Sequence, residues 1–149
     1  MHKSAEVLNS LITINNDRIQ GYETAFDETK DADLKSLFTQ FIQTSKNAKR
    51  ELEAEVIQLG EKPDDGTRLD GKIYRVWMDF KAAITGKDRE GILNSCEYGE
   101  DVALNTYKDA LEEDHVDSKY IPMIESQRDR IKMEHDRVKN LRDIATVKS

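Results

Sequence analysis

Three polar residues, Glu100, Arg128 and His135, lie on helix faces that are otherwise apolar, and Glu97 lies at the edge of such a face. Their types are those of metal ligands and buried ion pairs. Glu97 and Glu100 are three residues apart, so their carboxylates share one face of a helix. Arg128 and His135 are seven residues apart, on an apolar stripe that includes Ile131. Carboxylates and an imidazole from facing helices bind iron or manganese in ferritin-like carboxylate proteins. The same residue types also suit a buried polar network that fixes the register of the helices.

The first and second predicted helices carry polar residues at a similar height. Asn15 and Asn16 occupy the middle of the apolar stripe of the first helix, and Glu51 borders the stripe of the second. All four long helices are therefore expected to contribute polar groups to one layer of the interior.

The spacing of these residues argues against a native metal site. Ferritin-like carboxylate proteins carry Glu-x-x-His on two of their helices, and this chain contains no such motif. Lys132 stands where a ligand is needed, three residues before His135, and Glu134 lies ~100° around the helix from His135. We therefore favour a structural polar layer and expect no cofactor. The favoured layer comprises Glu97, Glu100, Arg128, His135, Asn15 and Asn16, and the alternative is an iron or manganese site at Glu51, Glu97, Glu100 and His135.

Apolar residues recur at three- and four-residue spacing over most of the chain, which predicts long helices. Gly60 follows the second stripe, where a left-handed helix cap is expected, and Pro63 prevents continuation. Pro122 is tolerated only in the first turn of the last helix. The predicted helices cover residues 4–29, 32–59, 69–84, 88–113 and 118–147.

The order of these helices predicts two long hairpins joined by a segment at about 61–87 that contains the shorter helix. This segment is long enough to cross the bundle, so that the second and fourth helices run parallel. We expect one all-α domain over residues 1–149, a ferritin-like four-helix bundle of two antiparallel hairpins with a helical crossover. A five-helix up-and-down bundle is the competing topology.

The two predicted hairpins resemble each other weakly. An offset of 84 or 85 residues aligns Tyr22 with Tyr107 and places the Asn15–Asn16 pair opposite Glu100. The same offset pairs Glu51 with His135. These matches suggest an internal duplication.

The bulk composition excludes several classes of protein. The net charge of −7 disfavours binding to phosphate backbones, so no nucleic-acid partner is expected. No apolar run approaches the ~20 residues of a membrane span, so no membrane partner is expected either. Cys96 is the only cysteine and cannot form an internal disulfide. We expect a cytoplasmic protein.

Several stretches of the sequence carry a family resemblance. They include "LNSLITINNDRIQGYETA" (8–25), "YRVWMDFKAAITG" (74–86) and "CEYGEDVALNTYKDAL" (96–111), with "ELEAEVIQLG" (51–60) and "HDRVKNLRD" (135–143) beside them. With these stretches the chain resembles a bacterial family of ferritin-like four-helix-bundle proteins described only as a domain of unknown function. The resemblance implies a crossover helix between two hairpins and no enzyme activity. Ferritin-like relatives often handle iron or oxidants and are often linked to stress.

These observations together predict a small non-enzymatic bundle with a structural polar core, with a stress-associated role implied by the resemblance. The first alternative is a protein that binds iron or manganese or handles oxidants. The second alternative is a self-associating module, such as a homodimer, that binds partners through a helix face.

Overall fold

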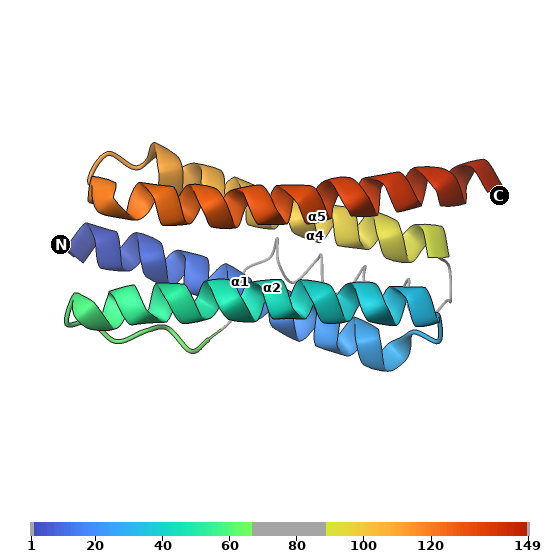
Figure 1. The fold of residues 1–149 in the computed structure, drawn as a ribbon, viewed down its shortest axis with the longest axis horizontal. Helices are drawn as coiled ribbons and strands as arrows, with labels where there is room; N and C mark the ends of the chain where they lie inside the picture. The colour runs from blue at the N-terminus through green and yellow to red at the C-terminus, as the bar shows by residue number, and fades with distance from the viewer. Residues whose placement is uncertain (1, 67–88, 149) are drawn as a thin grey trace.

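The computed structural model describes residues 2–66 and 89–148, which form four long helices and one turn of 3-10 helix (Figure 1). No strand occurs within these two ranges, so the predicted all-α class is confirmed. The predicted helix over 69–84 lies outside the described residues. The elements are α1 (His2–Glu28), α2 (Ala32–Gln58), α4 (Arg89–Glu112), η1 (Ser118–Tyr120) and α5 (Ile121–Lys148).

The helices form two antiparallel pairs that lie side by side (Figure 1). α1 packs against α2 and α4 packs against α5, while α1 also contacts α4 and α2 contacts α5. α2 and α4 run in the same direction, as predicted for a connection that crosses the bundle. The start of α4 lies near the turn before α2, because Arg89 donates to Asp33 at 2.5 Å and to Asp31 at 3.3 Å. None of the described helices is apolar enough over sufficient length to cross a lipid bilayer.

The end of α2 is fixed by the glycine that the sequence predicts as its cap. Gly60 has a φ of 78°, a left-handed conformation that is unfavourable for residues with a Cβ. Its amide donates to the carbonyl of Ile57 at 2.9 Å, and the amide of Glu61 donates to the carbonyl of Val56 at 3.2 Å. This pair of bonds is the Schellman arrangement, which satisfies carbonyls that the helix leaves without partners.

The segment after α2 turns back and lies along α1. The side chain of Asn9 accepts from the amide of Asp64 at 2.8 Å, and Thr13 donates to the Asp64 carboxylate at 2.6 Å. One turn further along, Asn16 donates to the carbonyl of Gly66 at 2.9 Å. The hydrogen bond from Thr13 is the main reason that the pKa of Asp64 is lowered. Residues 61–66 therefore run along α1 from its Asn9 toward its Asn16, which is the direction that the predicted crossover requires.

The apolar core is divided into two clusters with polar residues between them. On α1 the first cluster ends at Ile14 and the second begins at Tyr22. On α4 the second cluster ends at Cys96 and the first begins at Val102. Both clusters draw side chains from α1, α2, α4 and α5. The interval between the two clusters holds the polar residues considered next.

Candidate functional site

A buried arginine, Arg18 of α1, lies between the two apolar clusters and is only 5% exposed. Its Nη2 donates to Oε1 of Glu100 at 2.8 Å and to Oε1 of Glu134 at 2.7 Å. Its Nε donates to the same oxygen of Glu100 at 3.1 Å, and its Nη1 donates to Oγ of Ser45 at 2.5 Å. Because Ser45 is on α2, Glu100 on α4 and Glu134 on α5, one side chain of α1 bonds to all three other long helices.

Hydroxyl groups also donate to the two carboxylates. Tyr22 donates to Oε1 of Glu100 at 2.6 Å, and Thr44 donates to Oε2 of Glu134 at 2.5 Å. Oε2 of Glu100 is buried and has no hydrogen-bond partner within the described ranges. We call this set the central ion network; its members are Arg18, Tyr22, Thr44, Ser45, Glu100 and Glu134.

The central ion network shifts the pKa values of its members. Burial alone would lower the pKa of Arg18, but the carboxylates of Glu100 and Glu134 more than offset this effect and raise it. Burial also raises the pKa of Glu134, against the opposing effects of Arg18 and Thr44. One cation faces two carboxylates, so the network has an excess negative charge when both are ionised. A proton on Glu134 relieves that excess, which agrees with the direction of its shift.

Aromatic rings pack against one side of the guanidinium. The ring of Tyr22 stacks on Phe38 with centroids 5.4 Å apart and meets Phe41 edge-on at 5.1 Å. Cζ of Arg18 lies 5.6 Å from the Tyr22 ring centroid and 5.9 Å from that of Phe41. These contacts add cation–π attraction and keep water away from the charged groups.

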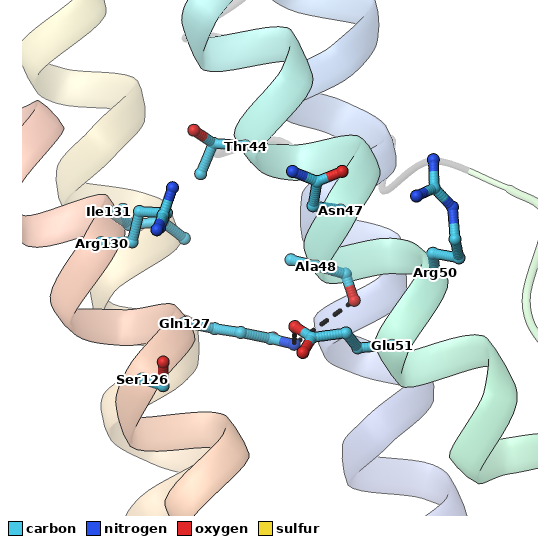
Figure 2. A pocket seen from close by; sticks show the side chains of 9 residues that line it. All are labelled: Thr44, Asn47, Ala48, Arg50, Glu51, Ser126, Gln127, Arg130 and Ile131. Carbon is cyan, nitrogen blue, oxygen red and sulfur yellow. Dashed lines mark hydrogen bonds between the residues drawn. The ribbon is translucent and has the colours of Figure 1, made fainter.

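A second chain of polar side chains crosses the bundle next to the central ion network. Asn15 donates to the hydroxyl of Tyr107 at 2.9 Å, and that hydroxyl donates to Oε1 of Gln127 at 2.7 Å. Gln127 in turn donates to Oε1 of Glu51 at 3.1 Å and to the carbonyl of Ala48 at 3.3 Å (Figure 2). This amide–tyrosine chain therefore also joins all four long helices.

The predicted 85-residue offset relates these two sets of contacts. It aligns Tyr22 with Tyr107 and Asn15 with Glu100. In the structure the Tyr22 hydroxyl bonds to Glu100 and the Tyr107 hydroxyl bonds to Asn15. When the offset is applied, the residues of the Tyr22–Glu100 contact therefore correspond to those of the Tyr107–Asn15 contact. This relation is expected between two copies of one hairpin.

A pocket between α2 and α5 opens beside both polar sets (Figure 2). Its walls include Thr44 of the central ion network and Gln127 of the amide–tyrosine chain, and Arg50 and Arg130 also line it. None of the lining residues that the structure describes is a histidine or a cysteine. Cys96 is buried elsewhere, and burial raises the pKa of its thiol, which keeps the thiol protonated and unreactive.

A second group of titratable side chains lies on the surface shared by α4 and α5. Nε2 of His135 is 2.8 Å from Oδ1 of Asp101 and 3.9 Å from Oε1 of Glu97. Nδ1 of the same ring is 3.1 Å from Oδ1 of Asp136. Arg142 donates to the other oxygen of Glu97. We call Glu97, Asp101 and His135 the α4–α5 surface triad.

Comparison with known proteins assigns the chain to a family without assigning a function. The sequence profile of the family described as Domain of unknown function (DUF2383) matches residues 3–113. The chain belongs to the DUF2383 family. No curated protein matches it. The DUF2383 match covers α1 from Lys3, α2 and α4, and it ends before η1 and α5. It therefore includes Arg18 and Glu100 but not Glu134 or His135.

The structure places part of the predicted polar layer in the core of this DUF2383 chain. Glu100 is completely buried in the central ion network, and Asn15 is completely buried in the amide–tyrosine chain. Asn16 is buried as well, but its side chain bonds to the segment after α2 and not to the other long helices. Glu97 and His135 are partly buried and lie together at the α4–α5 surface.

Two of the predicted residues lie elsewhere. Arg128 was predicted in the buried layer, and this prediction is wrong: its side chain is 37% exposed and bonds to the neighbouring Asp129 at 2.9 Å. Glu51 is exposed and bonds to Gln127, away from the Glu97–His135 pair. The four proposed metal ligands therefore do not converge on one point, since Glu100 faces Arg18.

Two charged members of the central ion network, Arg18 and Glu134, were not predicted from the sequence. Arg18 lies in the middle of the α1 stripe, three residues after Asn15 and four before Tyr22. Glu134 lies three residues after Ile131 and four before Val138, a spacing that also fits a buried stripe. The sequence signal for this pair was therefore an arginine and a glutamate that each occupy a position of the buried stripe, on helices of the same predicted bundle.

Proposed function

We propose that this protein is a non-enzymatic ferritin-like bundle in which Arg18 takes the position that metal ions occupy in carboxylate-type relatives. The observation that carries the proposal is the bonding of one guanidinium to carboxylates from α4 and α5. Ferritin-like carboxylate proteins direct the same type of ligand inward from facing helices, with the metal supplying the positive charge.

The residues of the core do not suit a metal centre. The guanidinium already supplies hydrogen bonds to Glu100 and Glu134, and both carboxylates accept from hydroxyl groups as well. A metal ion at this place would displace Arg18 from its partners and leave a second buried cation beside it, which is strongly unfavourable. Iron or manganese at the ferritin position is therefore not favoured.

The central ion network and the amide–tyrosine chain suit a structural role. Each bonds side chains of all four long helices at one level, and a one-turn slip of any helix would separate the partners. A single polar layer of this kind can set helix register. We propose accordingly that the interior fixes the shape of a cytoplasmic bundle and that its biological activity lies in surfaces that bind partners.

Self-association is a second candidate function, favoured by the outer face of α5. Met133 and Ile144 are 72% and 51% exposed and lie eleven residues apart, about three helical turns, so they share one face. Light scattering after size exclusion should then show a dimer that becomes a monomer in the variant with Met133→Ser and Ile144→Ser. A monomeric wild-type chain at high concentration would contradict this candidate.

The main proposal is tested by iron oxidation and stability together. We expect untagged protein to oxidise added Fe²⁺ no faster than buffer, and we expect Glu100→Gln to lower the free energy of unfolding. A stoichiometric burst of Fe²⁺ oxidation that Glu100→Gln abolishes would overturn the proposal.

The positional part of the proposal has its own test. Arg18→Ser leaves the carboxylates of Glu100 and Glu134 facing a space without a cation. If that space corresponds to a metal position, Mn²⁺ should raise the melting temperature of this variant, with His135→Gln added to exclude binding at the surface histidine. The same metal should leave His135→Gln alone unchanged. Equal responses from the two proteins would show that Arg18 does not stand at a metal position.

A further inference from the structure

We propose that the α4–α5 surface triad of Glu97, Asp101 and His135 binds one divalent transition-metal ion, a site separate from the central ion network. Glu97 and Asp101 are four residues apart and project from the same face of α4, and His135 faces them from α5. Glu100 lies between them in sequence but points into the core, where Arg18 holds it. The proposal does not depend on the proposed function of the core.

The triad has suitable dimensions. One ligand atom from each residue can be chosen so that all three lie within 4.8 Å of one another. Zinc bonds of about 2.0–2.2 Å to nitrogen and oxygen place ligand atoms about 3.4 Å apart in a tetrahedron. The Asp101 oxygen is already 2.8 Å from Nε2 of His135, so a small rotation of the exposed Asp101 carboxylate would make room for an ion between these two atoms.

Both partly buried members of the triad are held by outer partners. Nδ1 of His135 lies 3.1 Å from the Asp136 carboxylate, which Lys132 also binds at 2.9 Å. A ligand histidine typically donates its second ring N–H to such a carboxylate, which presents the other nitrogen to the metal. The Arg142 guanidinium likewise bonds to Oε2 of Glu97 and leaves Oε1 on the side of His135. The outer partners thus orient Nε2 of His135 and Oε1 of Glu97 toward the same point, as a metal site requires.

The ligand set selects the class of ion. One imidazole and two carboxylates suit Zn²⁺ or Mn²⁺, whereas Ca²⁺ and Mg²⁺ prefer oxygen ligands alone. The His135 side chain is 13% exposed and that of Asp101 is 53% exposed, so an ion can enter directly from solvent. Three protein ligands leave a coordination position for water, as in open zinc sites.

Calorimetric titration of untagged, chelator-treated protein with Zn²⁺ tests the proposal, and Mn²⁺ is used as a second probe. We expect one Zn²⁺ per chain, and we expect His135→Gln, Asp101→Asn and Glu97→Gln each to weaken binding by more than about 100-fold. Asp136→Asn alters only the outer partner and should weaken binding by roughly 10–100-fold. His115→Gln and Asp109→Asn change an exposed histidine and an exposed carboxylate elsewhere and should leave the affinity unchanged.

Nuclear magnetic resonance of the wild-type chain supplies a readout that needs no substitution. Zn²⁺ should shift the Nε2 resonance of His135 more than its Nδ1 resonance. The proposal is overturned if no Zn²⁺ binds more tightly than about 1 mM, or if His135→Gln binds as well as wild type. A loss of binding in His115→Gln would overturn it also, since the ion would then lie at another histidine. An ion pair alone between His135 and the two carboxylates would give the first of these outcomes.

Discussion

Replacing Arg18 by methionine removes the only cation of the central ion network while keeping a long side chain in the same space. Glu100 and Glu134 would both stay buried without a counter-ion. Breaking a buried ion pair from one side costs about 3–5 kcal/mol. Two carboxylates depend on this guanidinium, so we expect Arg18→Met to lower the free energy of unfolding by about 5 kcal/mol at neutral pH. For a chain of this size, that corresponds to a melting temperature lower by about 10–20 °C.

The size of this loss should depend on pH in a predictable direction. Burial raises the pKa of Glu134 even with Arg18 present, and removing the cation removes an effect that lowers it. An acid with a raised pKa in the folded state retains its proton there to higher pH than in the unfolded state. Folding is therefore penalised at neutral pH, and the penalty falls as the pH falls through the folded-state pKa. The destabilisation by Arg18→Met should be clearly smaller at pH 5 than at pH 8.

Urea unfolding followed by far-ultraviolet circular dichroism measures both quantities. Arg128→Met is the matched control, because it makes the same chemical change on the surface of α5, at a residue that bonds to its neighbour Asp129. We expect this control to change stability by less than about 0.5 kcal/mol. A cost of Arg18→Met below about 1 kcal/mol at pH 8, or an equal cost at pH 5 and pH 8, would contradict this prediction.

Three further predictions concern other parts of the interior and one helix end. Glu134→Gln should make the free energy of unfolding less dependent on pH. It removes a carboxyl group whose raised pKa makes wild-type stability fall as the pH rises above about 4.5. Urea midpoints at four pH values measure this dependence, and a slope equal to that of wild type would contradict the prediction. Tyr107→Phe breaks the amide–tyrosine chain and should cost about 1–3 kcal/mol by urea unfolding, whereas Tyr98→Phe, at an exposed site, should cost less than about 0.5 kcal/mol. Gly60→Ala should lower the free energy of unfolding by about 1–2 kcal/mol in the same assay, because a φ of 78° is strained for alanine. The added methyl group itself would meet no other atom. An equal or larger cost for Gly66→Ala would argue against backbone strain as the cause.

The helices could be predicted from the sequence because their apolar stripes are long and their ends carry strong signals. The start of α2 at Ala32 agrees with the prediction, and its end differs by one residue. Gly60 adopts the left-handed cap that its position after the stripe indicates. Pro122 is the second residue of α5, in the first turn as predicted. The short 3-10 helix before α5 was not predicted as such, since periodicity cannot separate three residues of 3-10 helix from an α-helix start.

The interior of α5 was harder to predict, for a geometric reason. The prediction placed Arg128 and His135 inward, whereas Gln127 and Glu134 are the buried residues. Each buried residue is one position before the predicted one, and Ile131 fits both patterns. A shift of one residue rotates the face by ~100°, and α5 has too few apolar residues on its stripe to decide between the two faces. Only the residues on the other helices that these side chains contact show which face of α5 is buried.

Arg18 was missed because an arginine is assumed to be exposed unless a partner is known. Its partners are 82 and 116 residues away in sequence, on α4 and α5, so no local pattern reveals them. Glu100 was correctly predicted inside, because apolar residues surround it on a single helix. Charges of opposite sign on the stripes of different helices would have indicated that Arg18 is buried. Each charge alone is costly to bury, so such charges are expected to pair.

The division of the central ion network between the two helix pairs affects how the chain folds. The cation lies on α1, and both of its carboxylate partners lie beyond residue 88, on α4 and α5. The pair α1–α2 alone would have to bury a guanidinium without a counter-ion, and the pair α4–α5 alone would have to bury two carboxylates. Neither half can close its apolar face until the other arrives. The chain should therefore fold in one cooperative transition, and separately produced halves should remain unfolded until they are mixed.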